Sequence, residues 1–196
     1  MAKAVHLIND EKFLPRFIER AASHFSSCAY IVFGATAPFK FLKEGNNVFV
    51  PSSWEAKGDQ PIEDVYIHFM TYQKIKWVKK HAPKARVHWV YFGSDLYELL
   101  STFHGFNLYS KQDRMGGFLS HIKGKTPRDR VLRYASLLVY HQHFKKFVKA
   151  HLTTFRFWNE GDYHLFKNAF STSARFELFQ YGAYLQSDID YVTGVL

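Results

Sequence analysis

Short apolar runs rich in β-branched and aromatic residues alternate with longer amphipathic stretches along the chain. The short runs predict seven strands: Ala4–Ile8, Ala29–Phe33, Asn47–Val50, Asp64–Phe69, Val87–Phe92, Thr153–Trp158 and Arg175–Tyr181. Helical spacing of apolar residues predicts helices over Phe13–Phe25, Lys74–His81, Arg128–Lys149 and from Asn159 to Phe170. Strands that alternate with helices are typical of a parallel sheet. We therefore predict an α/β fold, Rossmann-like, with an open, mostly parallel sheet and helices on both faces.

Two polar segments are predicted to be loops. One is Pro51–Pro61, and the other is the basic segment that starts at Lys111 and ends where Thr126 and Pro127 begin the long helix. Asp10 directly follows the first strand, where it can cap the next helix.

Length and composition exclude several classes of protein. The 196 residues suit one domain, residues 1–196, and 47% hydrophobic with 18% aromatic residues excludes disorder. No apolar run approaches the roughly 20 residues of a membrane span, and the N-terminus lacks the features of a signal peptide. The single cysteine, Cys28, excludes an internal disulfide and a cysteine-rich zinc site, and suits a reducing compartment. We expect a cytoplasmic protein.

The net charge of +9 favours an anionic partner: nucleic acid, a phospholipid surface or a phosphorylated substrate. Basic and apolar residues interleave in Lys74–Lys80 and Lys145–Lys149. These segments are either solvated helix faces over a buried stripe or faces attracted to an anionic membrane. We expect no nucleic acid, because no RNA- or DNA-binding signature accompanies the charge.

Ligands of open α/β sheets bind beyond the carboxyl ends of the strands. Polar residues or glycines follow the predicted strands at Asn9-Asp10, Gly34, His68, Tyr91–Asp95, Asn159–Asp162 and Tyr181-Gly182. At Gly93-Ser94-Asp95 the glycine permits close backbone approach, and the amides of a helix N-terminus attract a phosphate or carboxylate. The alternative is that Ser94 or Asp95 merely caps a helix.

Single residues at these ends have two interpretations each. His68 is a candidate general base, or a histidine held by a backbone hydrogen bond at the sheet edge. Asp162 either caps a helix or binds a sugar hydroxyl. No glycine-rich dinucleotide or P-loop motif is present, and His141 and His143 do not share a helix face. We expect no metal and no cofactor.

Three segments of the chain resemble segments of a known family and occur in the same order. Trp89–Leu99, with its Gly93-x-Asp95-Leu96-Tyr97-Glu98-Leu99 block, resembles the bacterial TDP-N-acetylfucosamine:lipid II N-acetylfucosaminyltransferases, the 4-alpha-L-fucosyltransferase family. Val65–Phe69 looks like the family's aromatic strand that ends in histidine, and Asn159–Tyr163 looks like its Gly-Asp helix. The chain has Phe92 where the family typically has tryptophan and Ser94 where it often has alanine.

The resemblance implies the N-terminal, acceptor-side half of a two-Rossmann (GT-B) glycosyltransferase. Such enzymes move a deoxy-amino sugar from a nucleotide donor to a polyprenyl-diphosphate-linked saccharide at the inner face of the cytoplasmic membrane. A full member is nearly twice this length, so we expect the donor-binding domain to be absent and the chain alone to be inactive or nearly so. Asp95 and His68 become the catalytic candidates. The substrate-binding candidates are Gly93, Ser94, Tyr91, Tyr97, Glu98, Asn159 and Asp162.

A rival function belongs to another class. The chain can be a non-catalytic module that recognises an anionic glycan, lipid or protein partner. The donor sugar, the acceptor and the stereochemistry of transfer do not follow from the sequence.

Overall fold

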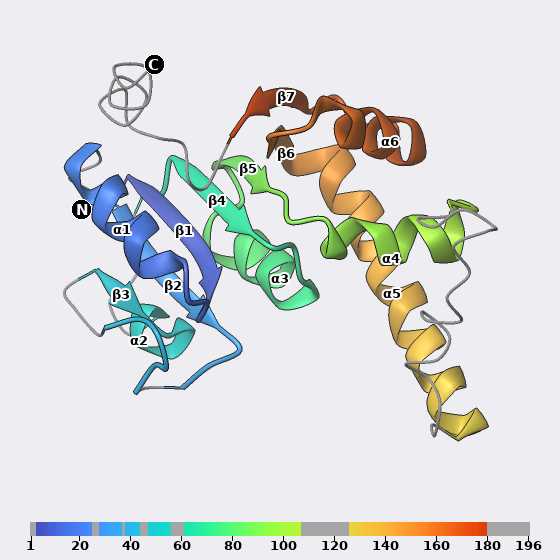
Figure 1. The fold of residues 1–196 in the computed structure, drawn as a ribbon, viewed down its shortest axis with the longest axis horizontal. Helices are drawn as coiled ribbons and strands as arrows, with labels where there is room; N and C mark the ends of the chain where they lie inside the picture. The colour runs from blue at the N-terminus through green and yellow to red at the C-terminus, as the bar shows by residue number, and fades with distance from the viewer. Residues whose placement is uncertain are drawn as a thin grey trace, which may run out of the picture.

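A computed structural model of the chain describes residues 3–24, 28–36, 38–43, 47–55, 61–106 and 126–179. Seven strands within these ranges form one sheet (Figure 1). They are β1 (Ala4–Asn9), β2 (Cys28–Phe33), β3 (Val48–Phe49), β4 (Asp64–His68), β5 (Arg86–Val90), β6 (Leu152–Phe157) and β7 (Arg175–Leu178). Every neighbouring pair is parallel, in the order β3-β2-β1-β4-β5-β6-β7. The predicted α/β, Rossmann-like fold is confirmed.

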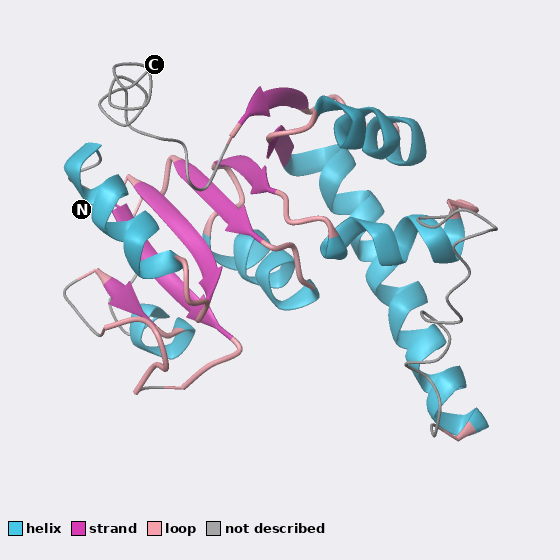
Figure 2. Cartoon of the chain, in the orientation of Figure 1, coloured by secondary structure: helices cyan, strands magenta, loops and turns pink. Residues whose placement is uncertain are grey.

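Helices connect these parallel strands and cover the sheet (Figure 2). They are α1 (Leu14–His24), α2 (Pro51–Glu55), α3 (Tyr72–His81), α4 (Ser94–Phe103), α5 (Pro127–His151) and α6 (Glu160–Phe170). The chain runs outward from β1 through β2 to β3, and then returns to the other side of β1 as β4. The direction of the strand order therefore reverses between β1 and β4, which is the point where open α/β sheets bind ligands.

The two faces of the sheet pack against different helices, because side chains of a strand alternate between faces. On one face, Val5, Ile67 and Trp89 belong to a large apolar core with buried residues of α3, α4, α5 and α6. On the other face, Tyr30 and Val32 pack with α1 in a smaller core. We call these the broad face and the α1 face.

The α1 face carries a row of rings across four neighbouring strands. Tyr30, His6, Tyr66 and His88 are aligned in the strand register. Consecutive ring centroids are 5.1, 4.6 and 4.6 Å apart, and each pair is stacked. The row on the α1 face is therefore aromatic, but each of its rings carries a polar group.

Three local predictions were wrong. Residues Pro51–Glu55 form the short helix α2 rather than a loop, and Trp54 is buried in the broad-face core. Asp10 does not cap α1; its carboxylate accepts the backbone N–H groups of Lys40, Phe41 and Leu42 instead. The predicted strand Arg175–Tyr181 ends at Leu178.

Other boundaries differ by one or two residues, and the start of α5 follows its sequence signal closely. Thr126 is the N-cap of α5, and its side chain and that of Asp129 form a reciprocal capping box. Residues 111–125 of the predicted basic loop and the candidates Tyr181 and Gly182 lie outside the described residues.

Candidate functional site

The carboxyl ends of all seven strands lie at one edge of the sheet, because the strands are parallel. A first cavity of about 460 Å³ lies at this edge, across the reversal between β1 and β4. It is lined by Asn9–Glu11 after β1, Phe33–Ala35 after β2, Lys40, and Thr71 and Gln73 at the start of α3. The sequence placed Asn9, Asp10 and Gly34 at this edge, and the structure brings them to one cavity.

The wall of the first cavity is held by Asp10. Its carboxylate accepts three backbone N–H groups of the loop after β2, from Lys40 at 2.5 Å, Phe41 at 3.1 Å and Leu42 at 3.0 Å. Gly34 has a φ of +73°, and a Cβ built on it would meet nothing within 4 Å. The backbone conformation therefore favours glycine, while the space beside it is open.

A second cavity of about 250 Å³ lies next to the first on the broad face. It is lined by Phe69–Tyr72 after β4, by Asp95, Glu98 and Leu99 of α4, and by Leu137 and Tyr140 of α5. Thr71 lines both cavities. Phe69 has a φ of 62°, which is strained for a residue with a side chain.

Asp95 is the buried acid of the second cavity. Its Oδ2 accepts the Met70 N–H at 2.9 Å and the Trp89 Nε1–H at 2.8 Å, and its Oδ1 accepts the Phe92 N–H at 3.3 Å. Burial raises the pKa of Asp95 to about 6, although these hydrogen bonds act in the opposite direction. The carboxyl group therefore changes charge close to neutral pH.

Asp95 does not cap α4 through its side chain. The N-cap is Gly93, which has a φ of 94° and no side-chain cap hydrogen bond. Asp95 lies in the first turn and joins the ends of β4 and β5 to the helix through its three hydrogen bonds. The side chain of Ser94 lies outside the described residues.

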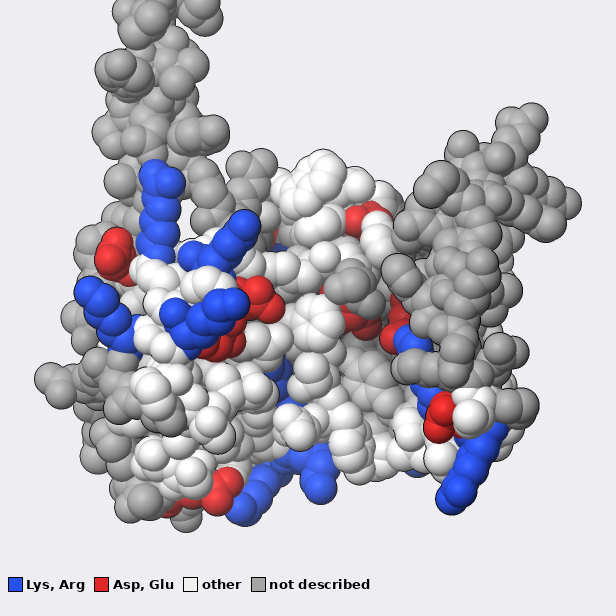
Figure 3. Space-filling view, turned by 60° about the horizontal axis from the view of Figure 1, so that its bottom comes forward, with Lys and Arg blue, Asp and Glu red and all other residues white. Residues whose placement is uncertain are grey.

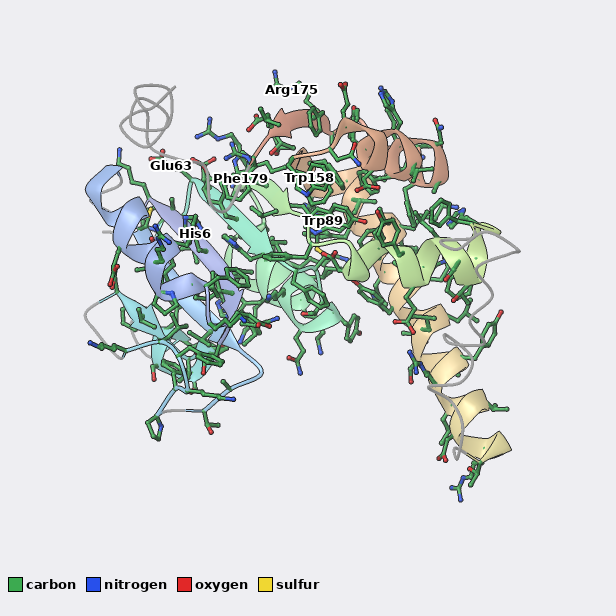
Figure 4. The ribbon with its side chains drawn as sticks, in the orientation of Figure 1. His6, Glu63, Trp89, Trp158, Arg175 and Phe179 are labelled. Atoms are coloured by element: carbon green, nitrogen blue, oxygen red, sulfur yellow. The ribbon has the colours of Figure 1, made fainter. Side chains whose placement is uncertain are left out.

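The structure does not bring His68 and Asp95 together. His68 is buried on the α1 face, where its Nε2 is 2.8 Å from His6 Nδ1 and its ring packs edge-on against Phe17 of α1. Trp89, which is labelled in Figure 4, donates a hydrogen bond to Asp95 and packs on the broad face against Phe144 and Phe166. The two catalytic candidates therefore lie on opposite faces of the sheet.

His68 is held as a neutral imidazole. Burial first, and then the charges of His6, Lys74 and Arg156, hold the pKa of His68 well below its usual range. The imidazole is thus enclosed and hydrogen-bonded to a second histidine side chain, whereas the sheet-edge interpretation expected a backbone partner.

Lys74 is a buried base between the two cavities. Its side chain is fully buried, and its Nζ donates to the carbonyl oxygens of His68 at 2.5 Å and Phe69 at 3.0 Å. Burial lowers the pKa of Lys74 to about 7, although the negative charges of Asp95 and Glu11 act to raise it. A neutral amine has two N–H groups, which the two carbonyls use, and one free lone pair.

Four of the proposed substrate-binding residues form one cluster: Tyr91 and Gly93 after β5, Tyr97 of α4 and Asp162 of α6. Tyr91 Oη donates to the Gly93 carbonyl at 3.0 Å, and Tyr97 Oη donates to Asp162 Oδ1 at 2.7 Å. A Cβ on Gly93 would contact the Tyr97 ring at 3.4 Å, so the glycine allows the aromatic side chain to lie against the backbone. The sequence blocks around Gly93 and Asp162 are thus brought together through Tyr97.

Asp162 is not the cap of α6. Asn159 takes that position, and its Oδ1 accepts the Gly161 N–H at 2.9 Å. Glu98 lines the second cavity and forms an ion pair with Arg133 of α5.

Sequence reasoning missed Lys74, Thr71 and Tyr140 as parts of this region. Lys74 has a signal that could have identified it: it shares the inner stripe of α3 with Ile75 and Val78, where a lysine is unusual. Tyr140 is far from the other lining residues in sequence, and only the packing of α5 places its Oη 2.9 Å from the Met70 carbonyl.

The described residues hold no group of three or more His, Cys, Asp or Glu side chains arranged for a metal ion. His104 and His141 do meet, with their Nε2 atoms 3.2 Å apart. Across the face shown in Figure 3, charged side chains occur in small separate groups with uncharged side chains between them. None of the helices in the described ranges is long and apolar enough to cross a membrane.

Comparisons of the chain with protein-family models, with curated proteins and with solved structures gave no match. The geometry of the two cavities and the segments that carry the resemblance are therefore what indicates a function.

Proposed function

We propose that this chain is the acceptor-side domain of a glycosyltransferase that moves a sugar from a nucleotide donor to a polyprenyl-diphosphate-linked saccharide. One observation carries the proposal: the buried Asp95 carboxylate lines a cavity at the carboxyl edge of a parallel sheet. The resemblance of Trp89–Leu99 to the 4-alpha-L-fucosyltransferase family supports the same function.

Asp95 is proposed to accept the proton of the acceptor hydroxyl. A carboxylate offers about four lone-pair sites, and the hydrogen bonds from Met70, Trp89 and Phe92 occupy three. The bond at Oδ1 is the longest of the three, at 3.3 Å, so this oxygen is the better acceptor for a further donor. With a pKa of about 6, Asp95 is ionised at neutral pH and still basic enough to take a proton in the transition state.

The two cavities divide the acceptor between them in this proposal. The sugar that carries the reacting hydroxyl occupies the second cavity, against Asp95 and Tyr140. The first cavity continues beyond Thr71 and offers Asn9, Gln73 and Lys40 to further hydroxyls and to the diphosphate. His68 serves as a positioning residue, because its carbonyl holds Lys74 between the cavities.

Acceptor binding by the full chain tests this proposal. Titration with a short-chain, water-soluble polyprenyl-diphosphate saccharide should give saturable binding that strengthens as pH rises through about 6, where Asp95 ionises. Asp95→Asn should remove that pH dependence. Leu137→Trp fills the second cavity and should weaken binding by about tenfold or more, a loss of about 1.4 kcal/mol.

Leu165→Trp is the matched control, because Leu165 is also half-buried in the broad-face core but does not line either cavity. Equal effects of the two tryptophan variants, or binding of the nucleotide sugar instead of the saccharide, would contradict the proposal. Substantial sugar transfer by this chain alone would contradict the assignment of the donor site to another domain.

A non-catalytic binding module remains the second candidate, because the three hydrogen bonds of Asp95 also give it a structural role. This candidate expects Asp95→Asn to lower the free energy of unfolding while leaving the pH dependence of saccharide binding unchanged.

A further inference from the structure

The outer face of α5 is unusually apolar for a helix on the surface of a protein. Half of the large hydrophobic residues that are exposed in the described part of the chain lie in one stretch of nine residues inside this helix. They are Val131, Leu132, Tyr134, Leu138 and Val139, and their exposed fractions run from 41% to 68%. A surface helix normally exposes polar residues and buries the apolar ones.

These side chains share one side of the helix. Positions three, four and seven residues apart lie on the same helix face, so Val131, Tyr134 and Leu138 form one stripe and Leu132 and Val139 its neighbour. Most contacts with the protein are made by the opposite side, through Leu137 and Tyr140 at the second cavity and Arg133 paired with Glu98. Tyr134, at the edge of the stripe, also has its ring 5.9 Å from that of Phe103. The N-terminal half of α5 extends beyond the sheet (Figure 1).

The same stripe becomes basic toward the C-terminus of α5. Continuing at the same spacing, it reaches Lys145, Lys146 and Lys149, which are all exposed, while Phe144 and Phe147 are buried on the inner side. None of the ion pairs between described residues involves these three lysines. The sequence has no Asp or Glu between Asp129 and Glu160.

The neighbouring helix α3 extends the basic part of this surface. It packs along α5, where the Tyr72 ring lies 4.9 Å from the His143 ring, and its Lys76 and Lys79 are exposed. Helix α3 contains no acidic residue. The surface therefore has an apolar part on α5 and an adjoining basic part on α5 and α3.

We propose that the outer face of α5 binds the surface of an anionic lipid bilayer, with its apolar half in the acyl boundary and its lysines at the head groups. The apolar residues supply area to bury and the lysines supply attraction to anionic lipid, the two contributions on which binding of a protein helix to a bilayer surface depends. The exposed apolar area is on the order of 500 Å², comparable to the largest apolar patch of a typical monomer, which is often functional, and below the roughly 800 Å² per partner that a stable dimer buries. The inference rests on the proposed function only for the orientation of the cavities toward a lipid-linked acceptor.

Vesicle flotation of the full chain tests the proposal. Binding is expected to vesicles of phosphatidylglycerol and phosphatidylcholine, to fall with salt, and to be weak with phosphatidylcholine alone. The variant Lys146→Glu/Lys149→Glu should lower the partition coefficient by about 20-fold or more, because each basic side chain near an anionic surface contributes about fivefold. The control variant Lys43→Glu/Lys84→Glu changes the net charge equally at exposed lysines away from α5.

The apolar half has its own variant and control. Leu132→Ser/Val139→Ser should lower binding by about tenfold or more, whereas Leu178→Ser, at an exposed leucine of β7, should not. In Tyr134→Trp, brominated acyl chains should quench the new tryptophan. All substituted side chains are exposed, so circular dichroism should show an unchanged fold.

Equal binding to neutral vesicles, or equal loss in the control variants, would overturn the proposal. A change of oligomeric state in Leu132→Ser/Val139→Ser without a change in flotation would assign the face to a protein contact instead. The vesicles contain no saccharide, so this result is independent of acceptor binding. The titration with a water-soluble acceptor is likewise independent of the membrane.

Discussion

The broad face and the α1 face of the same sheet solve the problem of burial in different ways. On the broad face, Trp89 lies edge-on to Phe144, Phe155 and Phe166, with ring centroids 5.2 to 5.3 Å apart. On the α1 face, the stacked row includes His6 and His88, and Arg156 lies 5.0 Å above the Tyr66 ring.

Parallel sheets are usually apolar on both faces, because helices cover both. Here only the broad face follows that rule among the described residues. The stability of its apolar core comes from buried area and packing, which do not depend on pH; the titrating groups on this side, Lys74 and Asp95, lie at the carboxyl edge of the sheet. The α1 face depends on imidazoles that stay uncharged, so its stability should depend on pH.

The largest expected effect is on the broad face. Phe155 is fully buried and contacts Trp89, Tyr91 and Phe166. Phe155→Ala should lower the free energy of unfolding by about 3–5 kcal/mol, through lost burial and the cavity that remains. Urea denaturation at pH 6, 7 and 8 should give the same loss each time. Leu178→Ala, at an exposed position, is the control; a loss under about 1 kcal/mol in Phe155→Ala would refute the description of this core.

Acidification should act on the α1 face. Burial lowers the pKa of His6 to about 3, and burial together with neighbouring charges holds that of His68 well below its usual range. Between about pH 6.5 and pH 3 the unfolded chain takes up protons at these histidines that the folded chain does not. The free energy of unfolding should therefore decrease as pH falls through 6.5, by up to about 1.4 kcal/mol per pH unit for each histidine.

The variant His6→Phe keeps a ring in the stacked row and removes one titrating group. It should reduce the slope of the free energy of unfolding against pH between pH 6 and pH 4, which chemical denaturation at a series of pH values measures. His164→Gln, on the exposed side of α6, is the control. An unchanged slope in His6→Phe would show that the histidine row does not distinguish the two faces.

The smallest effect is expected at the edge of the α1 face. Arg156 of β6 and Glu177 of β7 form an ion pair whose side chains are 22% and 38% exposed. Glu177→Gln should lower the free energy of unfolding by less than about 1 kcal/mol, because solvent screens such pairs. The difference in the free energy of unfolding between Glu177→Gln and the unsubstituted protein should become smaller still in high salt. A larger loss would indicate that charge holds this face together as firmly as apolar packing holds the other.

Much of the fold could be predicted from the sequence because each strand and most helices have a local pattern. Val87–Val90 is a continuous apolar run apart from His88, and Thr126 with Pro127 and Asp129 marks a helix start. Helix α2 could not be predicted in this way, because five residues are too few to show helical periodicity. Its buried anchor is Trp54, whose burial depends on the neighbouring strands.

The candidate site was predictable only in part. The sequence placed Asn9, Gly34, Asp95 and Asp162 at strand ends, and the structure places these residues at the same edge. The sequence did not indicate that Asp162 accepts a hydrogen bond from Tyr97, because the partner of a side chain at that edge depends on how α4 and α6 pack.

By itself, the sequence determined which segments are strands and helices and that the polar residues gather at the carboxyl ends. Those properties depend on local periodicity, on turn chemistry and on the parallel direction of the strands. Only the tertiary structure decided that His68 and Asp95 lie on opposite faces of the sheet and that Lys74 is buried between two cavities. The physical reason is that the order of the strands and the packing of the helices decide which side chains meet. Neither of these is determined by any single segment.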